Sequence, residues 1–424
     1  MLSPFRALRY DEATAGPLER LTSSPYDVVD AAGVAALEAS SVHNVVRLIL
    51  PREEVGSPQD DGDRYARAAR TLRSWRAEGA LRPDTTPGLY VYEQADPASG
   101  TAQRGLLGAL SLTPSEDMIV LPHENTMSGP VDDRLALYTA VGADLEPVFL
   151  VYEGGGTASR AVAEADREAP LVDVVLPDGL RHRLWTLTDA ALLREVAAAL
   201  LPRRAVIADG HHRYATYLRR QAAAHADGQG NGAWDAGLVF LVDASAFGPE
   251  VHPIHRVVPG RAADELAVLA KAGMRVHDLD GDDLESAQAA LAQAGEAGPA
   301  FLLVSGDGGT LRLLTDPDAD RLDRALPEDR SAAWRALDVT VLHHFVVADL
   351  WELPDTVETV GFEHDVSAAV AAAASSGGTA VLLNPTPVTA VAEVAATGER
   401  MPRKSTLFTP KPRTGLVLRD HRDV

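Results

Sequence analysis

The chain contains no cysteine, which excludes disulfide bonds, thiolate metal sites and cysteine nucleophiles. It has no apolar run of the roughly 18 residues that a membrane-spanning helix needs. Residues 1–6 also lack the apolar stretch of a secretion signal. We therefore expect a cytoplasmic protein with no membrane partner.

Positive charge is scarce, since 39 Lys and Arg residues stand against 61 Asp and Glu residues, a net charge of −22. Nucleic-acid binding needs a basic stripe, so we expect no nucleic-acid partner. A small anion in a local basic pocket stays compatible with this charge, because the potential of a pocket does not follow net charge. The only lysines are Lys271, Lys404 and Lys411. Two of them lie seven positions apart, a hint that the C-terminal segment needs a compact ammonium.

The length of 424 residues, of which 46% are hydrophobic, predicts two domains with real cores. The pattern predicts strands and helices without a steady βαβ rhythm, which favours an α+β fold with a mixed sheet. Residues 225–232 are rich in Gly, Asp and Gln and are typical of a loop. We therefore expect one domain over 1–230 and a second α/β domain over 231–424.

The most informative stretch is Ala-Asp-Gly-His-His-Arg-Tyr-Ala-Thr at 208–216. The apolar pattern predicts a buried strand over 204–208 and a helix over 214–224. Free amides at a helix start favour an anion, Arg213 can grip a phosphate with two N–H groups, and the histidines titrate near neutral pH. The alternative is a solvated turn in which Asp209 caps the helix.

His123 and Glu124 form a second acid–imidazole pair, followed by Arg134 on a helix expected over 132–142. A partly desolvated glutamate can act as a general base on a hydroxyl, although the same turn could be structural. Asp27 follows Pro25 and Tyr26, where it could simply cap a rigid turn.

Two C-terminal motifs also carry candidate side chains. His343 and His344 are adjacent in an expected helix, so their side chains point about 100° apart and do not face one ligand. Residues 398–405 lack the second glycine and the preceding strand of a P-loop. Lys404, Ser405 and Thr406 could still reach a phosphate from a loop of another kind.

Five motifs in order resemble the bacterial DUF1015 family of uncharacterised proteins, and together they span almost the whole chain. They start at Pro25, His123, Ala208, Leu337 and Met401 and cover 25–28, 123–126, 208–216, 337–343 and 401–411, with 415–417 after them.

The Asp-Gly-His-His-Arg sequence also resembles the signature of archaeal free-serine kinases of the ParB/sulfiredoxin-like superfamily. That resemblance implies a nucleotide-binding core in the N-terminal half, in which Asp209, His211, His212 and Arg213 line a phosphate site. It further implies ATP or ADP as the donor and free serine or a related amino acid as the acceptor, and thus a role in serine metabolism.

We therefore predict a small-molecule kinase whose C-terminal domain closes over the site. The predicted catalytic residues are Glu124, Asp209 and His211, with Mg²⁺ on Asp209. The predicted phosphate- or substrate-binding residues are Gly210, His212, Arg213, Lys404, Ser405 and Thr406, and the further candidates are Asp27, His123 and Arg134. The alternatives are a non-catalytic nucleotide-binding switch and a metal-dependent hydrolase that uses the histidine pairs.

Overall fold

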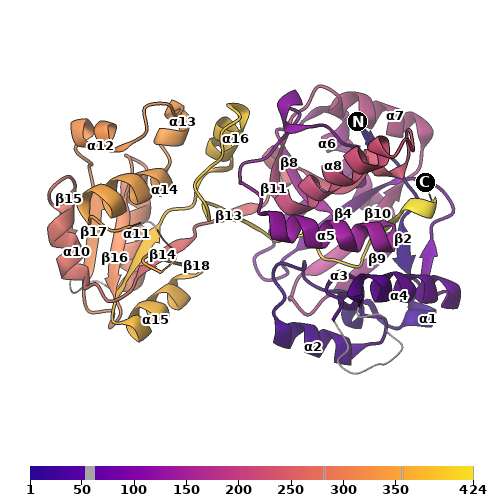
Figure 1. Cartoon of the computed structure of the whole chain (residues 1–424), viewed down its shortest axis with the longest axis horizontal. Coiled ribbons are helices and arrows are strands. Elements are labelled where there is room, and N and C mark those ends of the chain that lie inside the picture. The colour runs from indigo at the N-terminus through magenta and orange to yellow at the C-terminus, as the bar shows by residue number, and fades with distance from the viewer. Residues whose placement is uncertain (53–62, 280, 282, 355, 357, 424) are drawn as a thin grey trace. The chain divides into compact units, whose positions relative to one another are not determined.

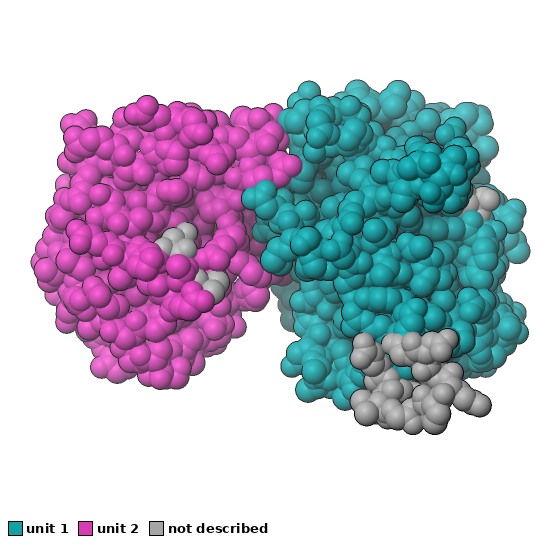
Figure 2. All heavy atoms as spheres, in the orientation of Figure 1, with its two compact units in different colours: residues 1–249, 410–424 teal, residues 250–409 magenta. Residues whose placement is uncertain are grey.

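The structure is a computed structural model that describes residues 1–52, 63–279, 281, 283–354, 356 and 358–423. The chain divides into two compact units, coloured separately in Figure 2. Unit 1 contains Met1–Pro249 and Pro410–Val424, and unit 2 contains Glu250–Thr409. The chain thus returns to unit 1 for its C-terminal segment.

This division differs from the expected boundary at 230. Strand β12 (Ala236–Asp243) is an inner strand of the unit 1 sheet, where it pairs with both β5 and β8. The boundary therefore falls after β12, and the loop between α8 (His211–Ala226) and β12 connects two elements of one unit. The segment 410–424 also belongs to unit 1, which local sequence pattern could not reveal.

Unit 1 is built on a mixed sheet that is nine-stranded in the described residues, in the order β6-β11-β8-β12-β5-β4-β10-β9 with β1 on β5. Figure 1 labels β4, β8, β9, β10 and β11 of this sheet. The β6–β11 and β8–β12 pairs are parallel and the other pairs are antiparallel, so the expected mixed sheet is confirmed. Its strands are β1 (Leu2–Ser3), β4 (Leu89–Ala95), β5 (Ala102–Ser111), β6 (Val120–Leu121), β8 (Val148–Tyr152), β9 (Val172–Val175), β10 (Arg181–Leu187), β11 (Ala205–Asp209) and β12.

The remaining elements of unit 1 are helices and two short strand pairs. The strand pairs are β2 (Leu8–Tyr10) with β3 (Leu81–Pro83) and β7 (Ala143–Asp144) with β21 (Arg419–Asp420). The α-helices are α1 (Glu12–Ala15), α2 (Ala31–Ser40), α3 (Val46–Ile49), α4 (Arg64–Glu78), α5 (Ser128–Val141), α6 (Gly156–Glu164), α7 (Ala190–Leu200), α8 (His211–Ala226) and α9 (Ala244–Phe247). Short 3₁₀ turns are η1 (Leu18–Arg20), η2 (Ser115–Asp117), η3 (Ala165–Arg167), η4 (Ala233–Asp235) and η6 (His421–Asp423).

Unit 2 contains a six-stranded antiparallel sheet in the described residues, in the order β15-β17-β16-β19-β14-β18. Its strands are β14 (His255–Val258), β15 (Arg275–Asp278), β16 (Phe301–Ser305), β17 (Leu311–Thr315), β18 (Gly361–Glu363) and β19 (Thr379–Leu383), and β13 (Glu250–His252) pairs separately with β20 (Leu407–Thr409). The helices are α10 (Ala263–Ala270), α11 (Leu284–Gly295), α12 (Ala319–Ala325), α13 (Ala332–Arg335), α14 (Asp338–Thr340), the π-helical η5 (Val341–Leu350), α15 (Val366–Ser376) and α16 (Val388–Ala396).

Helix caps and apolar faces follow the sequence pattern. Helix α4 (Arg64–Glu78) has Asp63 as its N-cap residue, whose carboxylate accepts the Tyr65 amide, and it buries Ala69, Leu72 and Trp75 at helical spacing. All five residues of β8 are buried, as expected for a strand covered on both faces. In the described part of the chain, no helix combines the length and the apolar character needed to cross a bilayer.

Candidate functional site

The turn between β11 and α8 presents the Asp-Gly-His-His-Arg sequence. Asp209 ends β11, and the pairing of β11 with β8 shifts register between Ile207 and Asp209, a local irregularity that changes the direction of the strand end. Gly210 has φ 95°, a left-handed conformation that a side chain would strain. Helix α8 begins at His211, three residues earlier than expected, so the histidines and Arg213 lie in its first turn.

Asp209 lies between two cations. Its Oδ2 accepts a hydrogen bond from the Arg213 guanidinium, and its Oδ1 lies 2.6 Å from the Lys411 ammonium. The same ammonium lies 2.6 Å from Oδ2 of Asp27. We call Asp27, Asp209, Arg213 and Lys411 the Asp209 cluster. Its charges balance, because two carboxylates face one guanidinium and one ammonium.

The two cations of the Asp209 cluster differ in exposure. Arg213 is 1% exposed and also donates from Nη1 to the Pro147 carbonyl at 2.5 Å, so it fixes Asp209 from inside the protein. This differs from the expected direct grip of Arg213 on a phosphate. The side chains of Lys411 and Asp27 are 18% and 38% exposed. Lys411 is therefore the cation of the cluster that a ligand can approach.

The pKa shifts in the Asp209 cluster follow from these ion pairs. Burial alone would lower the pKa of Lys411, but the carboxylates of Asp209 and Asp27 raise it above its ordinary value. For Asp27, burial would raise the pKa, but Lys411 and Arg213 hold it below its ordinary value. Both groups are thus charged at neutral pH.

The two histidines accept hydrogen bonds from the segment that carries Glu124. Nε2 of His211 accepts from the backbone amide of His123 at 3.3 Å, and Nε2 of His212 accepts from that of Met127 at 3.1 Å. The rings of His123 and His211 meet edge to face at 4.6 Å between centroids. Since an accepting nitrogen carries no proton, both neutral rings carry theirs on Nδ1. Nδ1 of His211 then lies 3.9 Å from Oε2 of Glu124.

Acidic pH is expected to release the 123–127 segment from α8. Burial lowers the pKa of His212 below its ordinary value of 6.5, so the open form binds more protons than the closed form. The contact is thus fully stable above about pH 6.5 and weakens as the pH falls toward the lowered pKa. Hydrogen exchange of a peptide over 123–127, corrected for intrinsic rates, should show lower protection at pH 5.5 than at pH 7.5. Equal protection at both values would contradict this account.

Arg134 supports the Tyr26 turn from inside the protein. It is 3% exposed, donates from Nη1 to the Ile49 carbonyl at 2.6 Å, and pairs with Asp133. Its guanidinium lies 4.4 Å from the centroid of the Tyr26 ring, a cation–π contact next to Asp27. Arg134 is therefore placed to hold the turn rather than to face a ligand.

The other predicted site residues lie in unit 2. Ser405 is buried and donates from Oγ to the Pro402 carbonyl at 2.5 Å, so its hydroxyl closes its own turn. Lys404 is exposed with φ 55°, and its carbonyl accepts from Arg256 at 3.0 Å. Thr406 follows in the same segment. These residues are not part of the Asp209 cluster, which unit 1 forms by itself.

The histidine pair in unit 2 has separate surroundings for each ring. Nε2 of His343 accepts from Nε of the buried Arg256 at 3.0 Å. The ring of His344 instead lies edge to face with Trp334, 5.3 Å between centroids. The two side chains thus do not face one ligand, as the helical spacing predicts.

The expected Mg²⁺ site on Asp209 does not fit the geometry. Mg²⁺ needs carboxylate oxygens that face the ion, but Oδ1 and Oδ2 of Asp209 are each engaged by a cation. Among the residues that the structure describes, no group of three or more His, Asp or Glu side chains is arranged to hold a metal.

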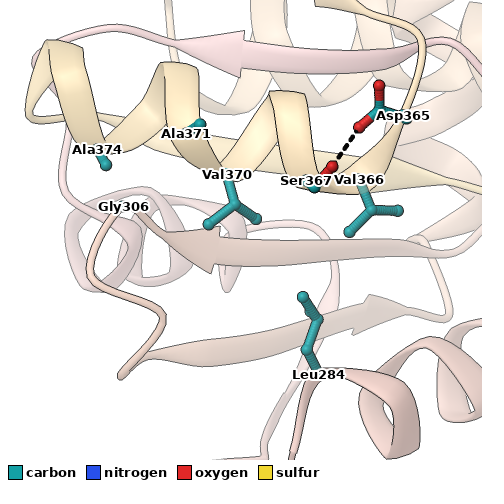
Figure 3. A pocket seen from close by; sticks show the side chains of 8 residues that line it. All are labelled: Leu284, Gly306, Asp365, Val366, Ser367, Val370, Ala371 and Ala374. Atoms are coloured by element: carbon teal, nitrogen blue, oxygen red, sulfur yellow. Dashed lines mark hydrogen bonds between the residues drawn. The ribbon is translucent and has the colours of Figure 1, made fainter.

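A hollow of about 650 Å³ lies in unit 2 beside α15 (Figure 3). Its lining is mostly apolar, and its one acidic side chain, Asp365, caps α15 by accepting the Ala368 amide and the Ser367 hydroxyl. The lining residues are Leu284, Gly306, Asp365, Val366, Ser367, Val370, Ala371 and Ala374. The carboxylate and the hydroxyl of this lining are thus used in the cap of α15.

The sequence prediction missed two residues around the Asp209 cluster. Lys411 was noted for its rarity but was not assigned to the site, although its position between Pro410 and Pro412 in a lysine-poor chain is a usable signal. Glu146 carries no motif. Its buried carboxylate accepts from the Tyr26 amide at 2.9 Å, a contact between residues far apart in the chain.

A model for a family described as a protein of unknown function (DUF1015) matches residues 2–340. No curated protein matches the chain.

Three solved structures show low similarity. A free serine kinase mutant in complex with ADP is 14% identical, with 72% of this chain and 91% of that chain covered and a TM-score of 0.34. SbnI with a C-terminal truncation from Staphylococcus aureus is 12% identical, with 72% and 84% covered and a TM-score of 0.33. A conserved hypothetical protein from Pyrococcus furiosus is 13% identical, with 72% and 94% covered and a TM-score of 0.32.

Proposed function

The chain belongs to the DUF1015 family, and we propose that it is a nucleotide-dependent kinase that phosphorylates a hydroxyl group of a small molecule. One observation carries the proposal: the Asp209 carboxylate is held between Arg213 and Lys411 immediately before α8. The Asp-Gly-His-His-Arg sequence at this turn is also the one that resembles the free-serine kinases.

The start of α8 favours an anionic ligand. The first amides of a helix have no partner within the helix, and they carry the positive end of its dipole. In the described structure, the N-cap residue of α8 is Gly210, which has no side chain to cap the helix, whereas the N-cap residues of α4 and α7 are capping aspartates. The carboxylates of Asp27 and Asp209 would repel a phosphate, but the charges of Arg213 and Lys411 neutralise them. The preference of the helix start for an anion is therefore kept.

The reaction needs few protein groups. The acceptor oxygen bonds to the terminal phosphorus of ATP or ADP, the bond from that phosphorus to the bridging oxygen breaks, and ADP or AMP leaves. Glu124, next to His211, takes the proton of the acceptor hydroxyl. Lys411 offsets the negative charge that develops on the leaving phosphate.

The identity of the acceptor rests on the sequence resemblance. It points to free serine or a related hydroxylated amino acid, and so to serine metabolism in the cytoplasm. A contribution from Lys404, Ser405 and Thr406 of unit 2, which would close over the nucleotide, stays a prediction. The nucleotide-binding switch remains the competing function, since it uses the same phosphate site without Glu124.

Phosphorus NMR of the full chain with MgCl₂, ATP or ADP, and pooled amino acids including serine tests the proposal. We expect a new phosphomonoester signal with the wild type. Glu124→Gln should lower kcat by about 10²–10⁴-fold while nucleotide still binds. The matched control, Glu116→Gln, changes an exposed glutamate on η2 and should leave the rate unchanged. Nucleotide binding without turnover would favour the switch, and absence of both would reject the phosphate site.

A further inference from the structure

Three segments far apart in the chain supply the Asp209 cluster. The buried side chain of Glu146 is hydrogen-bonded to two of them and interacts through charge with Arg213, which holds the third. Asp27 lies in the turn after Pro25, Asp209 ends β11, and Lys411 lies in the C-terminal segment. We infer that Glu146, between β7 and β8, is a positioning residue that sets the distances within the cluster. This inference rests on the proposed function for its effect on turnover.

Glu146 joins two of the segments by hydrogen bonds. Its Oε1 accepts from the Tyr26 backbone amide at 2.9 Å, one residue before Asp27. The same oxygen accepts from the Thr414 hydroxyl at 3.3 Å, three residues after Lys411. One carboxylate oxygen thus holds the backbone next to Asp27 and the segment that carries Lys411.

The third segment is linked to Glu146 through charge. Glu146 is 0% exposed, and burial raises its pKa, while the nearby charges of Arg213 and Arg134 oppose that rise. Arg213 in turn donates to Asp209 and to the carbonyl of Pro147, the residue after Glu146. The negative charge of Glu146 therefore helps to keep the Arg213 guanidinium where it meets Asp209.

The second carboxylate oxygen of Glu146, Oε2, makes no hydrogen bond in the described structure. This oxygen is buried, and the buried Tyr138 hydroxyl and Nε of Arg213 also lack a hydrogen-bond partner among the described residues. A buried carboxylate with an unused oxygen is costly. The nearby charges of Arg213 and Arg134 offset this cost.

Two buried glutamines also hold the C-terminal segment that carries Lys411. The carbonyls of Pro410 and Lys411 accept from the buried amides of Gln103 and Gln94, each at 2.9 Å. These bonds fix the backbone of Lys411 against β4 and β5. The backbones of Ser23 and Thr414 also pair with each other, and Glu146 adds a side-chain link that reaches the Tyr26 amide next to Asp27.

The three lysines of the chain make a direct test practical. In ¹⁵N-lysine-labelled protein, each side-chain ammonium gives one signal, and Lys411→Arg identifies the signal of Lys411. In Glu146→Gln, which keeps an accepting oxygen for Tyr26 but removes the charge, the Lys411 signal should shift while those of Lys271 and Lys404 stay unchanged. With Glu116→Gln as the matched control, all three signals should stay in place.

Turnover supplies the second readout. A displaced cluster should lower kcat by roughly 10²-fold, with a much smaller change in KM for the nucleotide. If Glu146→Gln does not fold, Thr414→Val removes one contact to Oε1 without changing charge or shape, and it should shift the Lys411 signal in the same way. An unchanged Lys411 signal in a folded variant would overturn the inference. Because the signal needs no turnover, an inactive wild type would count against the proposed kinase and not against this role of Glu146.

Discussion

Replacement of Lys411 by methionine is expected to lower the rate of phosphoryl transfer by about 10²–10³-fold, the loss typical of removing one group that stabilises developing charge. Methionine keeps an unbranched side chain of similar length but removes the ammonium that lies 2.6 Å from both Asp27 and Asp209. The two carboxylates would then repel each other and the incoming phosphate. Initial rates of phosphomonoester formation at saturating nucleotide measure the effect.

The other two lysines are the controls for this prediction. Lys271 is exposed in unit 2 and has no assigned role, so Lys271→Met should leave the rate unchanged. Lys404→Met tests the earlier assignment of Lys404 to the phosphate site. If Lys404→Met lowers the rate more than Lys411→Met does, the cation that stabilises the developing charge is Lys404 of unit 2, and the assignment of Lys411 is wrong.

Replacement of Asp144 by asparagine is expected to destabilise unit 1 by about 3–5 kcal/mol, the usual cost of removing one partner from a buried ion pair. Asp144 is 0% exposed and lies within 3.0 Å of Arg220, Arg419 and His421. Burial would raise its pKa, but these cations hold it well below the ordinary value. Its stabilisation is thus present above about pH 4 and is lost as the pH falls toward the lowered pKa.

Urea unfolding, followed by hydrogen exchange of unit 1 peptides, measures this loss. Asp132→Asn is the matched control, because Asp132 pairs with Arg219 where both side chains are at least half exposed. An exposed pair contributes about 0–1 kcal/mol, so the control should change stability little. Equal effects of the two substitutions would show that the buried network around Asp144 does not fasten the C-terminal segment.

Local pattern was sufficient for the elements that carry the site. The strand over 204–208 and the helix after it follow from apolar periodicity, and the structure confirms both, with the start of the helix moved to His211. The shift has a local cause, since Gly210 takes the left-handed conformation that lets the helix begin directly after the strand. The sequence prediction places residues 211–213 in the turn, because hydrophobic periodicity is read from apolar positions and these three residues are polar.

The partners of Asp209 could not be predicted in the same way. Lys411 and Asp27 meet it only because the C-terminal segment returns to unit 1 after unit 2, and local pattern carries no information on such a return. Burial also decides roles, since Arg213 was expected to meet a ligand but is enclosed by protein oxygens. Ser405 illustrates the same point, because its buried hydroxyl donates to the Pro402 carbonyl of its own turn.

Titration of the full chain with ADP, followed through its phosphorus resonances, tests the central claim most directly. We predict that both phosphate resonances shift saturably with the wild type and with Lys271→Met, and that Lys411→Met needs at least about tenfold more protein for the same shift, equivalent to about 1.4 kcal/mol. The absence of a saturable shift with the wild type, or equal affinity in Lys411→Met, would contradict a phosphate site at the Asp209 cluster.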